Sequence, residues 1–358
     1  MPEPDVSELL SGTAPVPIVA APMAGGPSGP ALVAAVSRAG AFGFLAAGYK
    51  SAVEMGAEIA ATRERTDAPF GVNVFVPGPS AVDAEELTAY LDELAPDAER
   101  LGVALGAPLH DDDSYAAKLD LLERDPVAAV SFTFGTPDAS TVHRLHAVGT
   151  RVLVTVTGPA EASLAESAGA DALCVQGSEA GGHHSRFCND DTALSPLPLL
   201  DVLAAVGGAT PLPMLAAGGI ATGRGMADAL DAGAVAVQIG TALLAAPEAG
   251  TNATHRLALS DPRFTGTMLT RAFTGRPARG IRNRFMVDHP NAPSAYPQIH
   301  HATRPLRAAA AERGMADALH LWAGVGFRRA RAEPAGLIVD GLVEEFRLTR
   351  TRSPGADR

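Results

Sequence analysis

Two adjacent histidines, His183 and His184, follow a glycine-rich stretch near the middle of the chain. An apolar run ends at Gln176, and Gly181 and Gly182 stand directly before the histidines. Glycine allows the backbone to approach a ligand closely and to adopt positive φ without a Cβ clash. A histidine beside such a loop can take up or release a proton near neutral pH. We therefore expect acid–base chemistry, or orientation of a substrate, at His183.

Other chemistry is less consistent with this stretch. No set of cysteines and histidines with metal-ligand spacing surrounds it, so we expect no metal site. Ser178 does not stand in the Gly-x-Ser-x-Gly pattern of a serine nucleophile. We expect Glu179 to form structural hydrogen bonds, and one of the two histidines to lie at the surface.

Two further glycine loops follow later apolar runs. Gly218 and Gly219 lie in the first loop, and the second is the segment Gln238-Ile239-Gly240-Thr241. Backbone N–H groups in such loops, at the start of a helix, commonly hold a phosphate group. We expect a phosphate site formed by the two loops, to which the Thr241 hydroxyl could contribute. The alternative is that both loops are ordinary tight turns.

Two side-chain amides interrupt apolar segments. Asn73 lies within Phe70–Val76, and Gln176 ends its own run. A buried amide without a hydrogen-bond partner costs about 1–3 kcal/mol. Each amide alone could be a satisfied core group, but two at strand ends favour contact with the polar edge of a ligand.

Short aliphatic segments alternate with helical patterns over some 230 residues, which is typical of parallel strands covered on both faces. Glycine loops follow the first, sixth, seventh and eighth of these segments, and in a barrel such loops meet at one mouth. We therefore expect an α/β fold, a (β/α)8 TIM barrel, in preference to a doubly wound sheet. The expected strands are Pro17–Met23, Ala41–Ala46, Phe70–Val76, Ala128–Phe134, Arg151–Val156, Asp171–Gln176, Pro213–Ala217 and Ala234–Ile239.

The pattern changes after residue 245, which predicts a second unit. We expect the barrel to cover residues 13–245 and a small substrate or cap domain to cover residues 246–318. Residues 319–348 should return to pack on the barrel. Within the cap, the pattern predicts helices at Pro247–Leu259 and Pro305–Leu321, separated by an irregular Arg-rich stretch.

Composition excludes several classes of protein. The 358 residues carry a formal charge of −12 and no broad basic stripe, which argues against a nucleic-acid partner. The two cysteines, Cys174 and Cys188, cannot form a disulfide scaffold. No signal peptide and no apolar run long enough for a membrane span is readable. We expect a cytoplasmic protein.

The chain resembles the nitronate monooxygenase (formerly 2-nitropropane dioxygenase) family of FMN-dependent barrels. The resemblance covers about residues 15–290 and rests on motifs in family order: Ala21-Pro-Met-Ala-Gly25, Phe70-Gly-Val-Asn73, Gln176-Gly-Ser-Glu-Ala-Gly-Gly-His183, Ala217-Gly-Gly-Ile220 and Gln238-Ile-Gly-Thr241. The family fold, a barrel with a smaller substrate domain, agrees with the pattern above. Two parts depart from the resemblance: His184-Ser185, and residues 77–127, which match no motif we can place.

The resemblance also implies roles for individual residues. His183 matches the active-site histidine of the family, which acts on the acidic C–H of a nitroalkane or orients the nitronate. The residues that would bind FMN are Pro22, Met23, Ala24, Asn73, Gln176, Gly181, Gly182, Gly218, Gly219, Gln238, Ile239, Gly240 and Thr241.

The implied reaction is oxidation of alkyl nitronates by O2 to a carbonyl compound and nitrite. The same scaffold also serves flavin-dependent enoyl-ACP reductases and quinone reductases, in which NAD(P)H reduces FMN. A flavin-binding protein without turnover is a third alternative. The expected partners are therefore a small anionic substrate and O2, or NAD(P)H under the reductase alternative. A homodimer is compatible with the sequence.

Overall fold

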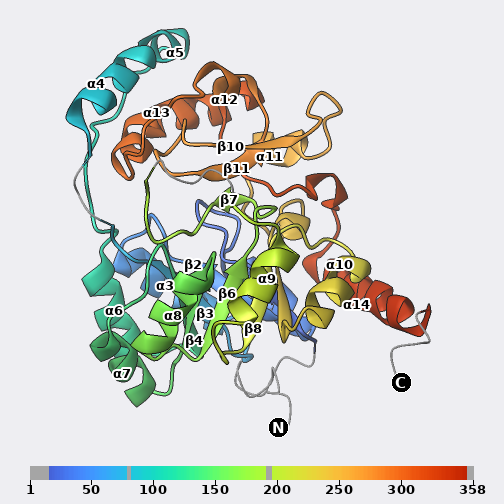
Figure 1. Cartoon of the computed structure of the whole chain (residues 1–358). Helices are drawn as coiled ribbons and strands as arrows, with labels where there is room; N and C mark the ends of the chain where they lie inside the picture. Colours follow the sequence, from blue (N-terminus) through green and yellow to red (C-terminus); the bar gives the residue numbers. More distant parts are fainter. Residues whose placement is uncertain (1–15, 79–81, 191–195, 353–358) are drawn as a thin grey trace.

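Eight parallel strands form a closed barrel in the computed structural model, which describes residues 16–78, 82–190 and 196–352 (Figure 1). The ring closes where Val19 of the first strand pairs with Gln238 of the last. The barrel confirms the expected (β/α)8 fold. Of the range 13–245 that was predicted for it, residues 13–15 lie outside the described residues. Its strands are β1 (Ile18–Ala20), β2 (Phe42–Ala46), β3 (Gly71–Phe75), β4 (Ala129–Thr133), β5 (Arg151–Val156), β6 (Ala172–Gln176), β8 (Met214–Ala217) and β9 (Ala236–Ile239).

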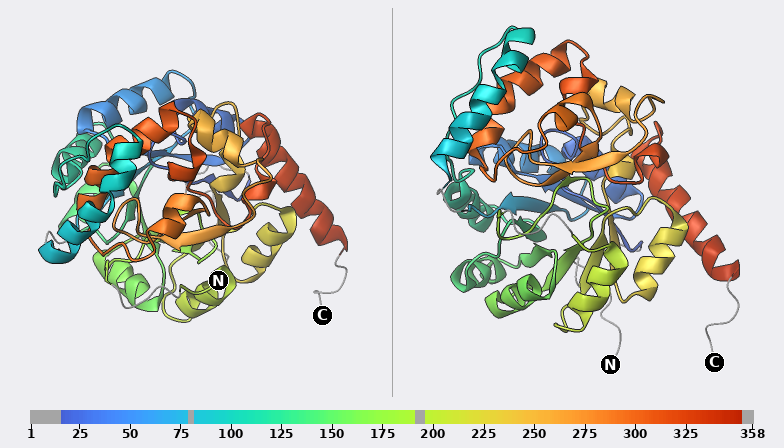
Figure 2. Two further views of the ribbon diagram at one scale, coloured as in Figure 1. Left: turned by 90° about the horizontal axis from the view of Figure 1, so that it is seen from above. Right: turned by 45° about the horizontal axis from the view of Figure 1, so that its top comes forward.

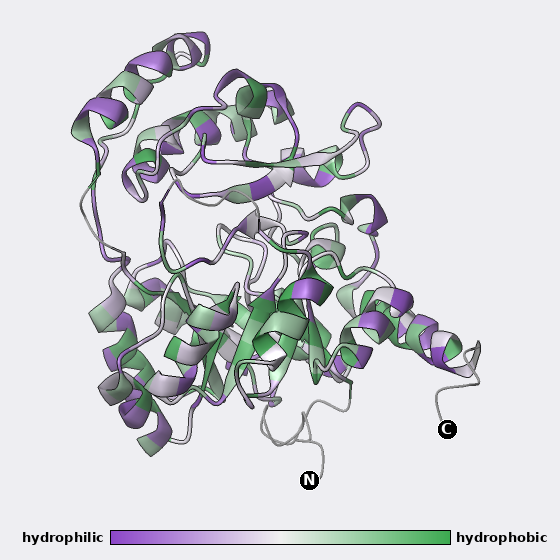
Figure 3. Cartoon of the chain, viewed as in Figure 1, coloured by the Kyte–Doolittle hydropathy of each residue, from purple (hydrophilic) through white to green (hydrophobic). Residues whose placement is uncertain are grey.

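Aliphatic strands explain this architecture, because their side chains are buried on both faces of the sheet. Phe42, Phe44 and Leu153 fill the inside of the barrel, while Val154 and Val175 pack against the outer helices. The strands are accordingly hydrophobic in Figure 3, and polar residues lie on the outer helices. The helices around the barrel are α2 (Pro30–Arg38), α3 (Ala52–Arg63), α6 (Tyr115–Arg124), α7 (Ala139–Ala147), α8 (Pro159–Ala168), α9 (Leu199–Gly207) and α10 (Gly223–Asp231).

The C-terminal helix α14 (Ala335–Arg352) completes the ring of helices. Only the short 3-10 helix η1 (Thr241–Leu243) directly follows β9, and α14 packs against α10 and α2. Ile338 and Val339 join the same apolar core as the barrel strands. The predicted boundaries at residues 245/246 and 318/319 stay predictions.

A second layer covers the carboxyl ends of the strands (Figures 1 and 2). It contains a three-stranded antiparallel sheet of β10 (Thr267–Thr270), β11 (Ala278–Ile281) and β7 (Gly182–His183). It also contains α11 (Ala253–Ala258), α12 (Arg284–Asp288) and α13 (Gln298–Glu312), with the 3-10 helices η2 (Ala316–Ala318) and η3 (Phe327–Arg329) in the chain that follows. We call this the cap layer.

Two helix predictions in the cap layer were wrong at their boundaries. The expected helix Pro247–Leu259 is shortened to α11, and the expected helix Pro305–Leu321 lies earlier, as α13. Proline is favoured in the first turn of a helix, and this preference misplaced the start of α13. Pro305 instead lies inside it, beside a second segment of chain, where the Gly106 amide donates to the Ala302 carbonyl.

Helices α4 (Ala84–Glu93) and α5 (Ala95–Arg100) also belong to the cap layer, although they follow barrel strand β3 (Figure 1). Leu87, Tyr90 and Leu94 lie in one apolar cluster with Phe273 and Ile299. The Tyr90 hydroxyl donates to the Ala272 carbonyl at 2.6 Å. Residues from three distant parts of the chain therefore build this layer.

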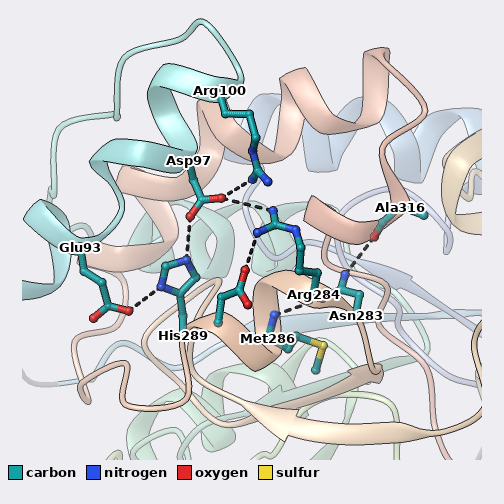
Figure 4. Close-up of polar contacts among 9 residues, drawn as sticks. Glu93, Asp97, Arg100, Asn283, Arg284, Met286, His289 and Ala316 are labelled. Atoms are coloured by element: carbon teal, nitrogen blue, oxygen red, sulfur yellow. Dashed lines mark hydrogen bonds and ion pairs between the residues drawn. The ribbon is translucent and has the colours of Figure 1, made fainter.

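A cluster of charged side chains fastens α4 and α5 to α12 (Figure 4). The two ring nitrogens of buried His289 lie 2.6 Å from Glu93 Oε1 and 2.8 Å from Asp97 Oδ2. Asp97 also accepts from Arg100 and Arg284. Asp97 is therefore the shared acceptor of the cluster.

No helix in the described part of the chain is long and apolar enough to cross a membrane.

The shared role of Asp97 predicts a measurable loss of stability. Asp97→Asn should lower the free energy of unfolding by about 2–3 kcal/mol, because charged hydrogen bonds are lost at a buried site. Glu93→Gln is the matched control and should cost less, since the Glu93 side chain is 47% exposed. Urea unfolding gives the free energies, and amide hydrogen exchange should accelerate in residues 84–101. Equal exchange in wild type and Asp97→Asn would contradict the assignment.

Candidate active site

A cavity of about 790 Å³ lies between the barrel mouth and the cap layer, within the usual size range of ligand pockets. His183 lines it, as do all but one of the residues predicted to bind a cofactor. These are Pro22, Met23, Ala24, Asn73, Gln176, Gly181, Gly182, Gly218, Gly219, Gln238, Gly240 and Thr241. The exception is Ile239, whose side chain is buried in the apolar core of the barrel.

Backbone pairing fixes the position of His183. The residue lies on β7 and pairs with Ala278 of β11, so the barrel loop becomes a strand of the cap sheet. The Gln176 amide supports the same turn from below. Its Nε2 donates to the His183 carbonyl at 3.1 Å, and its Oε1 accepts from the Ser185 amide at 2.8 Å. Gln176 therefore holds the histidine loop in addition to lining the cavity.

The surroundings of His183 keep its ring neutral. Burial, together with the positive charges of Arg276 and Arg307, lowers the pKa of His183 to about 3. Nε2 lies 3.0 Å from the Thr274 hydroxyl oxygen, which also lies 3.2 Å from the Arg276 carbonyl. When the hydroxyl donates to that carbonyl, the imidazole donates from Nε2 and Nδ1 is left as the basic nitrogen.

Aromatic rings enclose His183 on several sides. The centroids of Phe134, Trp322 and Tyr296 lie 5.7, 5.7 and 5.8 Å from that of the imidazole. Phe134 has a φ of +76°, which a bulky side chain rarely adopts. Such strained positions cluster at functional sites.

His184 and Glu179 have structural roles. The expectation that one histidine lies at the surface was wrong: His183 is half-buried, and His184 is buried and is not among the cavity-lining residues. The His184 amide donates to the Pro277 carbonyl at 2.7 Å, continuing the pairing between β7 and the cap sheet. Both Glu179 carboxylate oxygens accept from the Leu199 amide at the start of α9, which confirms the predicted structural role.

Close backbone packing at the far end of the cavity requires glycine. Gly219 has a φ of +69°, and a Cβ there would lie 2.9 Å from the Glu179 Cβ. A Cβ at Gly181 would collide with the Gly324 backbone nitrogen. The Thr241 hydroxyl accepts from the Gly324 amide at 3.0 Å and keeps its own hydrogen for a ligand. The two predicted glycine loops thus face one end of the cavity, together with residues around Gly324.

Two side-chain amides on barrel strands, those of buried Asn73 and half-buried Gln238, form the floor of the cavity. Asn73 Nδ2 lies 2.9 Å from Ser131 Oγ and 3.0 Å from Thr133 Oγ1. Gln238 Nε2 donates to Cys174 Sγ at 3.2 Å. The Asn73 Oδ1 and Gln238 Oε1 oxygens have no hydrogen-bond partner among the described residues. The floor therefore presents hydrogen-bond acceptors to a ligand.

Several cavity residues were not predicted from the sequence. The Tyr49 ring stacks on His300 with centroids 4.0 Å apart and planes 6° apart, and Tyr49 has a φ of +68°. The Tyr49 amide donates to Asp113 at 2.8 Å, and Asp113 pairs with the fully buried Lys118. Asp113 ends a run of three aspartates, a pattern typical of a solvated loop, so the sequence does not predict that it supports the cavity.

The opposite wall is formed by α13. His300 and Arg307 lie seven residues apart, a spacing that places both side chains on one face of a helix. That spacing could have identified them, but the helix was expected to begin at Pro305. Among the residues that the structure describes, no three His, Cys, Asp or Glu side chains are grouped so as to hold a metal ion.

Comparisons with known proteins agree with this geometry. A family model described as nitronate monooxygenase matches residues 7–345. A nitronate monooxygenase from Pseudomonas aeruginosa is 45% identical over 92% of this chain and 96% of its own. The crystal structure of a nitroalkane oxidase from Streptomyces ansochromogenes has a TM-score of 0.93 and 49% identity, covering 97% of this chain and 99% of its own. The structure of FabK from Thermotoga maritima is more distant, with a TM-score of 0.71, 25% identity and 97% coverage of both chains.

Because several buried histidines are neutral, we expect the free energy of unfolding to decrease in acid. Burial lowers the pKa of His184 and His255 to about 4, below the ordinary value of about 6.5. As pH falls through 6.5, the unfolded chain therefore takes up protons that the folded protein does not, and stability decreases. The free energy of unfolding should fall by up to about 1.4 kcal/mol per pH unit for each such histidine. Burial raises the pKa of Asp113 to about 6, which offsets part of the loss.

Urea unfolding between about pH 7.5 and about pH 5 would measure this dependence. His255→Gln is the informative variant, because His255 Nε2 is buried without a hydrogen-bond partner. It should flatten the pH dependence relative to wild type. A midpoint independent of pH across this window would contradict the assignment of buried neutral histidines.

Proposed function

This chain belongs to the nitronate monooxygenase family, and we propose that it oxidises alkyl nitronates with O2 in the cavity around His183. The products would be a carbonyl compound and nitrite, and the cofactor would be FMN. The observation that carries the proposal is a neutral histidine beside two buried guanidinium groups, those of Arg276 and Arg307. Positive charge in an enclosed site favours an anionic substrate over its neutral conjugate acid.

The residues present fit FMN. The Asn73 Oδ1 oxygen is an acceptor suited to the imide N–H of a flavin ring, because its own Nδ2 hydrogens are used by protein oxygens. Gly219 and the Thr241 hydroxyl would hold the phosphate, and the Met23 loop would support the ring. When bound, FMN supplies the electron transfer and the reaction with O2.

The protein side chains bind and orient the substrate. Phe134, Tyr296 and Trp322 surround His183 and limit the access of water to its ring. As a neutral nitroalkane loses its C–H proton, the negative charge that develops on its nitro oxygens would offset the charge of Arg276 and Arg307, and so would raise the pKa of His183 toward its ordinary value. His183 could then accept a proton from the carbon of a neutral nitroalkane, whereas a preformed nitronate needs no such step.

The role of His183 can be tested by comparing the two forms of the substrate. His183→Asn should lower kcat/KM for a neutral nitroalkane by about 10²–10⁴-fold, the usual contribution of general base catalysis. The loss with the preformed nitronate should be much smaller, because no proton is abstracted. Initial rates of oxygen uptake at one pH, normalised to flavin content, give both numbers. Equal losses for the two forms would remove the proton-abstraction role.

The source of the electrons separates the proposal from an NAD(P)H-dependent reductase. Anaerobic mixing of the FMN-loaded protein with a nitronate should bleach the flavin absorbance, since the nitronate is the proposed reductant. Mixing with NADH or NADPH should leave the absorbance unchanged on the same timescale. Bleaching only by pyridine nucleotide would contradict the proposed monooxygenase activity. A protein that binds no flavin after FMN is added would contradict the proposed cofactor.

A further inference from the structure

Three arginines lie in or near the cavity, but their environments differ. Arg304 lines the mouth and is exposed to solvent. Arg276 is buried, yet its guanidinium lies 3.9 Å above the Phe134 ring and donates to the Arg186 carbonyl, and it does not line the cavity. Arg307 alone of the three is both buried and part of the cavity wall.

Neutral groups hold the Arg307 guanidinium in place. Nε donates to the Thr303 hydroxyl at 3.2 Å, and Nη2 donates to the His300 carbonyl at 2.8 Å. The Thr303 hydroxyl in turn donates a hydrogen bond to the Phe273 carbonyl at 2.6 Å. Nη1 has no hydrogen-bond partner among the described residues. Two N–H donors of a fixed guanidinium therefore remain for a ligand.

No carboxylate compensates this charge. The charged or titratable groups that act on Arg307 are Tyr49, Tyr296 and Arg304, none of which is an acid at neutral pH. Burial lowers the pKa of Arg307 to about 10, so the group stays protonated. A buried charge without a counter-charge is costly, and buried charges in proteins are normally paired.

The neighbouring histidines do not supply the missing charge. His183, His300 and His320 all line the cavity, and burial lowers the pKa of each below its ordinary value. The positive charge of Arg307 contributes in the same direction in all three cases. Three acids line the cavity: Asp111 pairs with His301, Asp113 pairs with Lys118, and Asp112 accepts from the Ser114 amide.

We propose that Arg307 is the substrate-anion receptor of this cavity, with Nη1 donating to the oxygen atoms of the nitronate group. The proposal rests on the proposed function for the identity of the anion. Each oxygen of a planar O–N–O group is an acceptor, and a free N–H of Nη1 can donate a charged hydrogen bond to one of them. Thr303 and the His300 carbonyl act as positioning groups, because they fix the guanidinium before the substrate arrives.

Binding of an inert anion tests the proposal without turnover. Nitrate has the same planar O–N–O geometry and can be titrated into FMN-loaded protein by isothermal calorimetry. Arg307→Met should raise the Kd for nitrate by about 10- to 100-fold, the range expected for one charged hydrogen bond. Arg307→Lys should recover part of the affinity, because it restores the charge without the planar geometry. Arg313→Met, at the exposed C-terminal end of the same helix, should match wild type.

Turnover with an alkyl nitronate provides the second readout. Arg307→Met should raise KM by a similar factor, with flavin content like wild type and thermal stability no lower than wild type, because a costly buried charge is removed. Unchanged nitrate affinity and unchanged KM in Arg307→Met and Arg307→Lys would overturn the proposal, even if wild type oxidises nitronates. If wild type binds nitrate in an Arg307-dependent manner but does not oxidise nitronates, the receptor stands and the proposed function fails.

Discussion

The pairing of the two-residue strand β7 with β11 is the contact on which the site depends. Through this pairing, His183 of the loop after β6 becomes part of the edge strand of the cap sheet, opposite Ala278. The Gln176 amide secures the other side of the same turn. Strand β7 lies in the loop after barrel strand β6, whereas its partner β11 comes from the cap segment of the chain. The position of His183 therefore depends on how the barrel and the cap layer pack together. The close approach of Gly181 to Gly324 reinforces this joint.

Electrostatics follow from that geometry. Enclosure by two layers removes water, and burial is the largest cause of the lowered pKa values of His183 and His300. The same enclosure strengthens the influence of Arg276 and Arg307 on any ligand, because screening by solvent is weak inside. A cavity with neutral histidines and buried positive charge, in which Asp111 and Asp113 are paired with His301 and Lys118, is suited to an anionic ligand.

Sequence patterns were sufficient for the barrel and for the glycine loops, because both depend on local composition. Aliphatic strands of parallel type leave few alternative folds, and the loops after them must meet at one mouth. The cap layer was harder, because its contacts are distant in sequence. An apolar stripe such as Leu87 and Leu94 shows that a helix is buried on one face, but not which surface it packs on. Because Pro305 was expected in the first turn, the start of α13 was predicted seven residues too late. The helix face that carries Arg307 was therefore not recognised. Ile239 was assigned to the site by its motif, whereas its side chain faces the core.

Nitrite release coupled to oxygen uptake is the most direct test of whether this protein oxidises nitronates. An alkyl nitronate is added in air to the FMN-loaded protein, and both quantities are followed with time. Nitrite should form as oxygen is consumed, with saturation in nitronate concentration and no requirement for NADH or NADPH. Oxygen uptake that needs a pyridine nucleotide and yields no nitrite would contradict it.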